Sequence, residues 1–137
     1  NDLIEKKTSL QYMTYDEPSI IIENNFPKEV NYSDDFEIEM NINKDSFSKP
    51  ENVKIILSGT GFKNKWEIEK LEKEQDLSLE ISGKRLSWEN DFLIEIEWED
   101  KEQNKYYLKE EIIIKGNSKS FIDNFKMFSN WIIDILT

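Results

Sequence analysis

The side chains in this sequence that are best suited to chemistry are carboxylates, and they gather in three clusters. The clusters are Asp34-Asp35, the alternating Glu95, Glu97 and Glu99 with Asp100, and Glu110-Glu111. Carboxylate oxygens are preferred ligands of Ca²⁺, so each cluster is a candidate cation site. The spacing matches no EF-hand loop, however, and rows of carboxylates are also typical of a solvated strand face that discourages aggregation. We expect the solvated face, with Ca²⁺ binding as the alternative.

A pair of carboxylates is also the catalytic machinery of most glycosidases, in which one carboxyl group needs a raised pKa inside a cleft. Here the carboxylates alternate with lysines on faces that we expect to be wet, so nothing would desolvate them. The sequence contains no histidine and no cysteine, which excludes the Ser-His-Asp triad, thiol catalysis, disulfides and the commonest transition-metal ligands. We predict that the chain is not an enzyme and has no catalytic residue, metal or cofactor. A small enzyme is the less favoured alternative.

Tryptophans form a second group of candidate ligand-binding residues. Aromatic rings interleaved with Asp, Asn and Glu are typical of carbohydrate-binding faces, which makes Trp66 and Trp88 candidates for a sugar platform. Trp98 alternates with the apolar residues of an expected strand, so we assign it to the core. Packing in the core or over its end is the favoured interpretation of Trp66 and Trp88 as well. A carbohydrate-binding module is the alternative function that these two residues suggest.

The net charge limits the range of partners. The 137 residues include 29 acidic and 18 basic side chains, for a net charge of −11. Such a surface repels the phosphates of nucleic acids and the headgroups of anionic lipids. The sequence shows no signal peptide and no apolar stretch long enough to span a membrane. We therefore expect no nucleic-acid partner and no membrane span in this chain.

The elements that position these side chains are predicted to be strands, because apolar residues recur at every second position. The clearest example is a hairpin at 91–115, in which Phe92, Ile94, Ile96 and Trp98 share one face and 100–104 forms a polar turn. A lone hairpin is at best marginally stable, so the rest of the chain must cover its apolar face. The other inward-facing sets are predicted at 20–22, 36–42, 53–57 and 77–81, and the segment 66–71 is short and charged.

About seven short strands, with turn signals every 8–12 residues or so, predict an all-β fold. We expect an immunoglobulin-like antiparallel β-sandwich, and a closed barrel of similar strand count is the alternative. We place the sandwich at residues 18–116. It follows an N-terminal extension or edge strand at 1–17 and precedes a C-terminal amphipathic helix at 117–137.

The last segment changes from a two-residue to a helical period. Its polar stripe consists of Asp123, Lys126, Asn130 and Asp134, and Ser120 with Asp123 resembles a capping box. The helix has three interpretations, which we rank in this order: it packs on its own sandwich, it pairs with a partner protein or a second copy, or it leads toward a membrane anchor. The candidate partner-binding residues are Phe121, Phe125, Phe128, Trp131, Ile132 and Ile135.

Asn31-Tyr32-Ser33 is an N-glycosylation sequon in an expected loop. Asn31 is therefore a candidate glycosylation site. Its presence favours an extracellular location for this loop.

Several features follow one another in an order that is found in known surface modules. They are Pro27 with Ser33-Asp34-Asp35, the strand FEIEMNIN, the segments 51–55 and 71–75, and the hairpin at 94–107. This order resembles the immunoglobulin-like modules of archaeal surface-layer-related proteins and of bacterial cell-adhesion-related domains. Ser33 and Glu74 stand where that family usually has glycine, and the C-terminal helix is extra.

The resemblance implies a surface-exposed structural or adhesive module without catalytic residues to carry over. We therefore predict an extracellular or cell-surface protein module that binds its partners by surface complementarity. The helix at 117–137 is the predicted contact, either with a protein partner or in a homo-oligomer.

Overall fold

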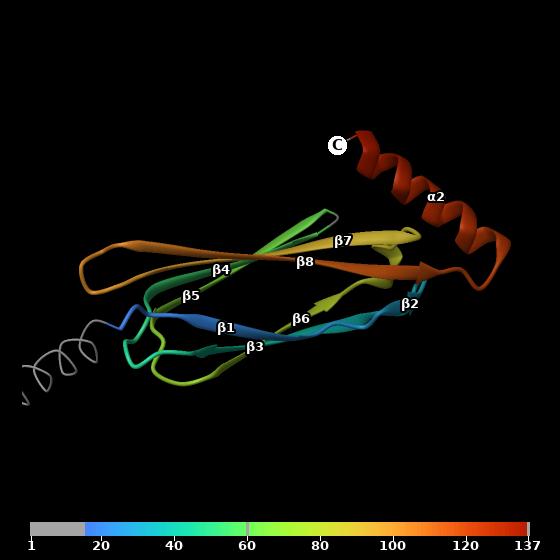
Figure 1. Cartoon of the computed structure of the whole chain (residues 1–137). Helices are drawn as coiled ribbons and strands as arrows, with labels where there is room; N and C mark the ends of the chain where they lie inside the picture. Colours follow the sequence, from blue (N-terminus) through green and yellow to red (C-terminus); the bar gives the residue numbers. More distant parts are fainter. Residues whose placement is uncertain (1–15, 60, 137) are drawn as a thin grey trace, which may run out of the picture.

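The computed structural model of the chain describes residues 16–59 and 61–136. These residues form two β-layers with one helix at the end of the sandwich (Figure 1). The strands are β1 (Ile20–Asn25), β2 (Glu29–Asn31), β3 (Phe36–Lys44), β4 (Glu51–Gly59), β5 (Phe62–Lys70), β6 (Gln75–Ile81), β7 (Glu89–Glu99) and β8 (Lys105–Asn117). One turn of 3₁₀-helix, η1 (Gly83–Arg85), precedes β7, and the α-helix α2 (Phe121–Leu136) follows β8.

The strands of the described residues separate into two sheets. One has the order β1-β3-β6 and the other has the order β2-β8-β7-β4-β5. All pairings are antiparallel except that of β2 with β8. The predicted antiparallel β-sandwich with a C-terminal helix is confirmed. The closed-barrel alternative is wrong, because the described strands do not join into one sheet.

The described part of the chain has eight strands, one more than the seven or so expected. The extra strand is β2, which lies in a stretch that we expected to be a polar connection. It has three residues and pairs in parallel with the end of β8, where Val30 lies opposite Gly116. Three residues are too few to show a two-residue period, so the sequence pattern does not reveal this strand.

Alternate side chains of the central strands fill the space between the two layers. Those with at most 1 % of their surface exposed include Ile38, Ile42, Val53, Ile55, Leu57, Ile94 and Ile96. Each such side chain contributes about 1.5–3 kcal/mol to the free energy of unfolding. On β6, a strand at the edge of its sheet, Ile81 is buried whereas Leu77 and Leu79 are half-buried against the core. The predicted inward-facing sets of β3, β4 and β7 are confirmed.

Trp98 closes the core at the end of the sandwich where the β7–β8 turn lies. Its side chain is 6 % exposed, and its Nε1 donates a hydrogen bond to the carbonyl oxygen of Pro18 at 2.8 Å. Its ring stacks on that of Tyr106 across the hairpin, with 6.0 Å between ring centroids. The prediction that Trp98 belongs to the core is confirmed.

The opposite end of the sandwich is built from η1, the start of β7 and the end of β8. The buried side chain of Asn90 accepts a hydrogen bond from the Ser87 amide at 2.8 Å and donates to the carbonyl oxygens of Ser87 and Ile114 at 2.9 and 3.0 Å. Gly116 donates its amide to the Trp88 carbonyl at 3.0 Å. A Cβ atom at Gly116 would lie 2.0 Å from the Ser87 carbonyl oxygen, so only glycine fits here. This end is therefore a closely packed platform, and α2 leaves from it.

Candidate interaction surface

Three residues separate the end of β8 from the start of helix α2, and the first turn of the helix is capped by its own sequence. The hydroxyl oxygen of Ser120 accepts a hydrogen bond from the amide of Asp123 at 3.1 Å. Asp123 also places a negative charge in the first turn, where the helix dipole favours it. These local signals account for where the helix begins. They do not decide which of its faces meets the sandwich.

The face of α2 that meets the sandwich is its polar one. Asn130 donates its side-chain amide to the carbonyl oxygens of Lys84 and Leu86, both at 2.9 Å. The Nε1 atom of Trp88 donates to the side-chain oxygen of Asn124 at 3.0 Å. Met127 is the one fully buried residue of the described helix, and it packs beside Gly116.

The platform explains this choice of face. The carbonyl oxygens of Lys84 and Leu86 point out of the η1 turn, and a backbone carbonyl that is buried without a donor costs about 1–3 kcal/mol. An amide side chain satisfies both carbonyls, whereas an apolar face would cover the partly buried carbonyl of Leu86 without giving it a donor. The helix therefore docks through Asn130 and Met127. Lys126, which we placed in the same polar stripe, is exposed instead.

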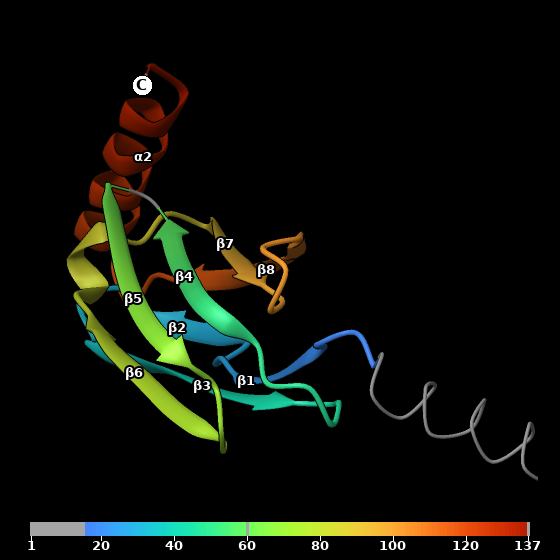
Figure 2. The ribbon, with the colours of Figure 1, turned by 90° about the vertical axis from the view of Figure 1, so that its left-hand side faces the viewer.

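Most of the apolar face of α2 is exposed, although Phe128 contacts the ring of Trp88 in the platform. In Figure 1 the chain turns back after β8 and α2 runs at a slant outside the larger sheet, and in both Figure 1 and Figure 2 the C-terminal end of the helix lies farther from the sheets than its start. The exposed fractions of its large apolar side chains are 86 % for Phe121, 65 % for Phe125, 42 % for Phe128, 43 % for Trp131, 36 % for Ile132, 63 % for Ile135 and 79 % for Leu136. The helix thus meets the end of its own sandwich through Met127 and Asn130, while most of its apolar side chains are left exposed.

The exposed residues lie along one line of the helix. Phe121, Phe125, Phe128, Ile132 and Ile135 follow at intervals of four, three, four and three residues, which places them on one face of an α-helix. We call these five residues the α2 seam. On a helical wheel the seam lies opposite Asp123 and Asp134, which are half-buried on the side of the sandwich. The seam is thus apolar along its whole length.

The two tryptophans proposed as a sugar platform have different surroundings. Trp66 lies on β5 opposite Ile55 of β4, where it is half-buried against the core. Trp88 lies between η1 and β7, is 39 % exposed, and contacts the ring of Phe128 with 6.2 Å between centroids. Trp88 thus forms part of the platform beneath α2. Sugar binding by Trp66 and Trp88 stays a prediction.

The carboxylate clusters do not converge on a metal site. Among residues 16–59 and 61–136, no group of three or more Asp and Glu side chains is arranged to hold a metal ion. On the outer face of the larger sheet, Glu95 accepts a hydrogen bond from the Tyr107 hydroxyl at 2.7 Å. This bond raises the pKa of Tyr107, with desolvation adding to the effect.

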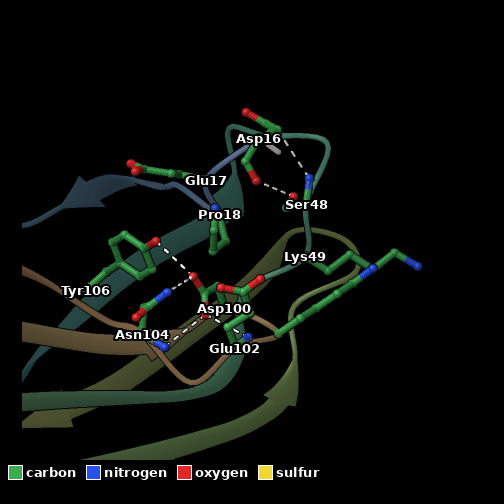
Figure 3. Close-up of a pocket in the computed structure, with 10 residues that line it drawn as sticks. Asp16, Glu17, Pro18, Ser48, Lys49, Asp100, Glu102, Asn104 and Tyr106 are labelled. Carbon is green, nitrogen blue, oxygen red and sulfur yellow. Dashed lines mark hydrogen bonds between the residues drawn. The ribbon is translucent and has the colours of Figure 1, made fainter. Parts of the chain in front are cut away.

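Asp100 lies at a hollow of about 210 Å³ at the far end of the sandwich (Figure 3). Its carboxylate accepts hydrogen bonds from the amides of Glu102 and Asn104 and from the Asn104 side chain, all at 2.9 Å, and from the Tyr106 hydroxyl at 3.1 Å. The bonds from Asn104, Tyr106 and Glu102 lower the pKa of Asp100 despite some desolvation. A glycosidase acid needs the opposite shift. Asp100 therefore shapes its own turn.

Asn31 is the last residue of β2, and its side chain is exposed directly before a turn at Ser33. Asn31 and Ser33 are therefore exposed while Tyr32 between them is buried, and Asn31 stands at a strand end and not in the expected loop. Glycosylation of Asn31 stays a prediction. Within the described part of the chain, α2 and the short η1 turn included, there is no helix with the length and apolar character needed to cross a membrane.

Comparison with known proteins identifies the fold. The solution structure of the CARDB domain of a Pyrococcus furiosus protein superposes with a TM-score of 0.56 at 15 % identity, over 72 % of this chain and 94 % of that one. A crystal structure of that domain in complex with di-metal ions superposes with a TM-score of 0.50 at 14 % identity, over 74 % of this chain and 89 % of that one. A cohesin module from a family 33 glycoside hydrolase of Clostridium perfringens superposes with a TM-score of 0.50 at 15 % identity, over 74 % of this chain and 98 % of that module.

At these identities the similarity shows the fold alone. It confirms the predicted immunoglobulin-like sandwich, and it confirms the family resemblance as far as a module of this fold. No protein-family model matches the sequence, and no curated protein matches it. The function must therefore be inferred from the surface of this chain.

Proposed function

We propose that this chain is a non-catalytic module of an extracellular or cell-surface protein, and that it binds another protein through the α2 seam. Its role is structural, adhesive or in assembly. The module contributes a rigid sandwich, and the sandwich presents one helix at its end. The partner covers the apolar side of that helix.

The observation that carries this proposal is the exposure of the seam. Phe121 and Phe125 expose 86 % and 65 % of their surface, and Phe128, Ile132 and Ile135 lie on the same face. Soluble monomers rarely expose a continuous apolar patch of more than a few hundred Å², and larger patches mark interaction sites. Met127 and Asn130 hold the helix in place from its opposite side. The seam is therefore presented in a defined orientation, which lowers the cost of binding.

The non-catalytic part of the proposal rests on chemistry. The sequence has neither histidine nor cysteine, and the carboxylate of Asp100 is committed to four hydrogen bonds of its own turn. Location outside the cell is supported by the resemblance to cell-adhesion-related modules and by the sequon, whose Asn31 is exposed.

Site-specific photo-crosslinking in the native host tests the proposal. A photoreactive phenylalanine analogue replaces Phe125 in one variant and Lys109, an exposed residue of β8, in a control variant. We expect ultraviolet light to join the Phe125 variant to one defined protein that mass spectrometry identifies, while the Lys109 variant gives no such adduct. Equal labelling of many proteins by both variants, or no protein adduct at position 125, would contradict the proposal.

A further inference from the structure

We propose that the partner of the α2 seam is a second copy of this chain, so that two α2 helices pair in a symmetric dimer. This inference rests on the proposed function, because it names the protein that covers the seam. Three observations support the inference independently of one another. They are the spacing of the seam residues, the position of the charged residues of α2 away from the seam, and the exposed area of the seam.

The spacing of the seam is that of a helix that pairs with another helix. Intervals of four, three, four and three residues repeat every 3.5 residues on average, which is the period of the a and d positions of a coiled coil. Ile122 and Leu136, exposed by 64 % and 79 %, flank the seam and widen it. A symmetric dimer needs a patch that is complementary to itself, and a uniform row of Phe and Ile knobs has this property.

The charges of the helix are kept away from the seam. Asp123 and Asp134 lie on the side of the sandwich, and Lys126 lies on the flank. Two bodies with a net charge of −11 repel each other, but no carboxylate is brought to the line of contact. A basic peptide is a poor occupant because the seam offers it no acidic group. A lipid surface is also disfavoured, since helices that lie on membranes are rich in Lys and Arg, and α2 has one lysine.

The exposed area of the seam matches the size of a stable dimer interface. The five seam residues and Leu136 expose between 36 % and 86 % of their surface, which amounts to roughly 700 Å² if each large side chain has about 200 Å². Two copies could thus bury at most roughly 1,400 Å², which reaches the range of about 1,200–2,000 Å² for specific protein interfaces. The helix of 16 residues is about 24 Å long, so the contact runs along its whole length.

Sedimentation equilibrium of the purified chain tests the dimer. We expect the wild-type chain to dimerise and the double variant Phe125→Glu/Ile132→Glu to weaken the dimer at least about a hundredfold, because each substitution places an unpaired charge in the interface. Ile113→Glu is the matched control: Ile113 is 57 % exposed on the outer face of the larger sheet, so this change should leave the dimer constant unaltered. Circular dichroism and thermal unfolding verify that the variants fold.

Disulfide trapping then locates the contact. The native chain has no cysteine, so single-cysteine variants at Phe125 and Ile132 report only the designed contacts. Parallel helices should trap each variant with itself, and antiparallel helices should trap one variant with the other. Trapping should fail when the cysteine replaces Ile113. A wild-type chain that stays monomeric at all accessible concentrations, or a dimer that survives the double substitution, would overturn the inference.

These outcomes separate the inference from the proposed function. If the chain is monomeric and the photo-crosslink at position 125 captures a different, identified protein, the second copy is wrong and the protein-binding function stands. If the chain is monomeric, captures no protein and binds phosphatidylcholine vesicles through Phe125, both proposals are wrong.

Discussion

The amphipathic pattern of α2 suggests that substitutions on its apolar face destabilise the chain and that those on its polar face do not. We predict the reverse. Met127 lies on the polar side and is fully buried, whereas Phe125 lies on the apolar side and is 65 % exposed. We predict that Met127→Ala releases the helix from the sandwich and that Phe125→Ser leaves it docked in the monomer. The comparison tests the orientation of α2, on which the seam depends.

The magnitudes follow from burial. Replacing a fully buried methionine by alanine costs about 2–5 kcal/mol, because apolar contacts are lost and a cavity remains. Alanine is the better helix former of the two, so a loss cannot come from helix propensity. A substitution at a largely exposed position changes stability by about 0.5 kcal/mol or less. Since a free helix of this length is marginal in water, the released α2 should unfold.

Hydrogen exchange of the α2 amides measures the effect, at a dilution where sedimentation shows the monomer. Met127→Ala should raise the exchange rate by at least about thirtyfold, since every 1.4 kcal/mol is about a factor of ten. Asn130→Ala should act in the same direction, because it leaves the carbonyls of Lys84 and Leu86 without their donor. Fast exchange in Phe125→Ser, together with unchanged exchange in Met127→Ala, would show that the helix docks through its apolar face.

Three other predictions concern the platform and the outer sheet face. Gly116→Ala should destabilise the chain by about 1–3 kcal/mol in urea unfolding, since its Cβ would meet the Ser87 carbonyl oxygen at 2.0 Å; an unchanged midpoint would contradict the close approach. Asn90→Ala should cost about 2–4 kcal/mol, because buried backbone groups lose their partners. Tyr107 should ionise above its ordinary pKa, so the stability from its bond to Glu95 is present below that pKa and is lost as pH rises through the raised value. Glu95→Gln should bring the pKa back toward the ordinary value, as ultraviolet absorbance of tyrosinate would report; an unmoved titration would argue against this bond.

The strands of the core could be predicted because a half-buried strand needs a two-residue period. Ile38, Ile55 and Ile96 fall on the predicted inward faces and are fully buried. The period is less clear on edge strands. We expected a short charged segment at 66–71, whereas β5 begins at Phe62. The polar Asn64 occupies a half-buried position of this strand and interrupts the apolar period. β2 has too few residues for any period and exists only because the end of β8 offers it a partner.

The helix after residue 120, with one apolar and one polar side, can be predicted from the sequence alone. Helical spacing and the cap at Ser120 are local properties, and local signals suffice for them. Only the tertiary structure decided which side faces the sandwich. Carbonyl oxygens of Lys84 and Leu86 emerge from the η1 turn at the place where α2 docks, and they require a donor. Since Asn130 supplies that donor, most of the apolar side is left exposed, and it forms the surface that we propose binds a partner.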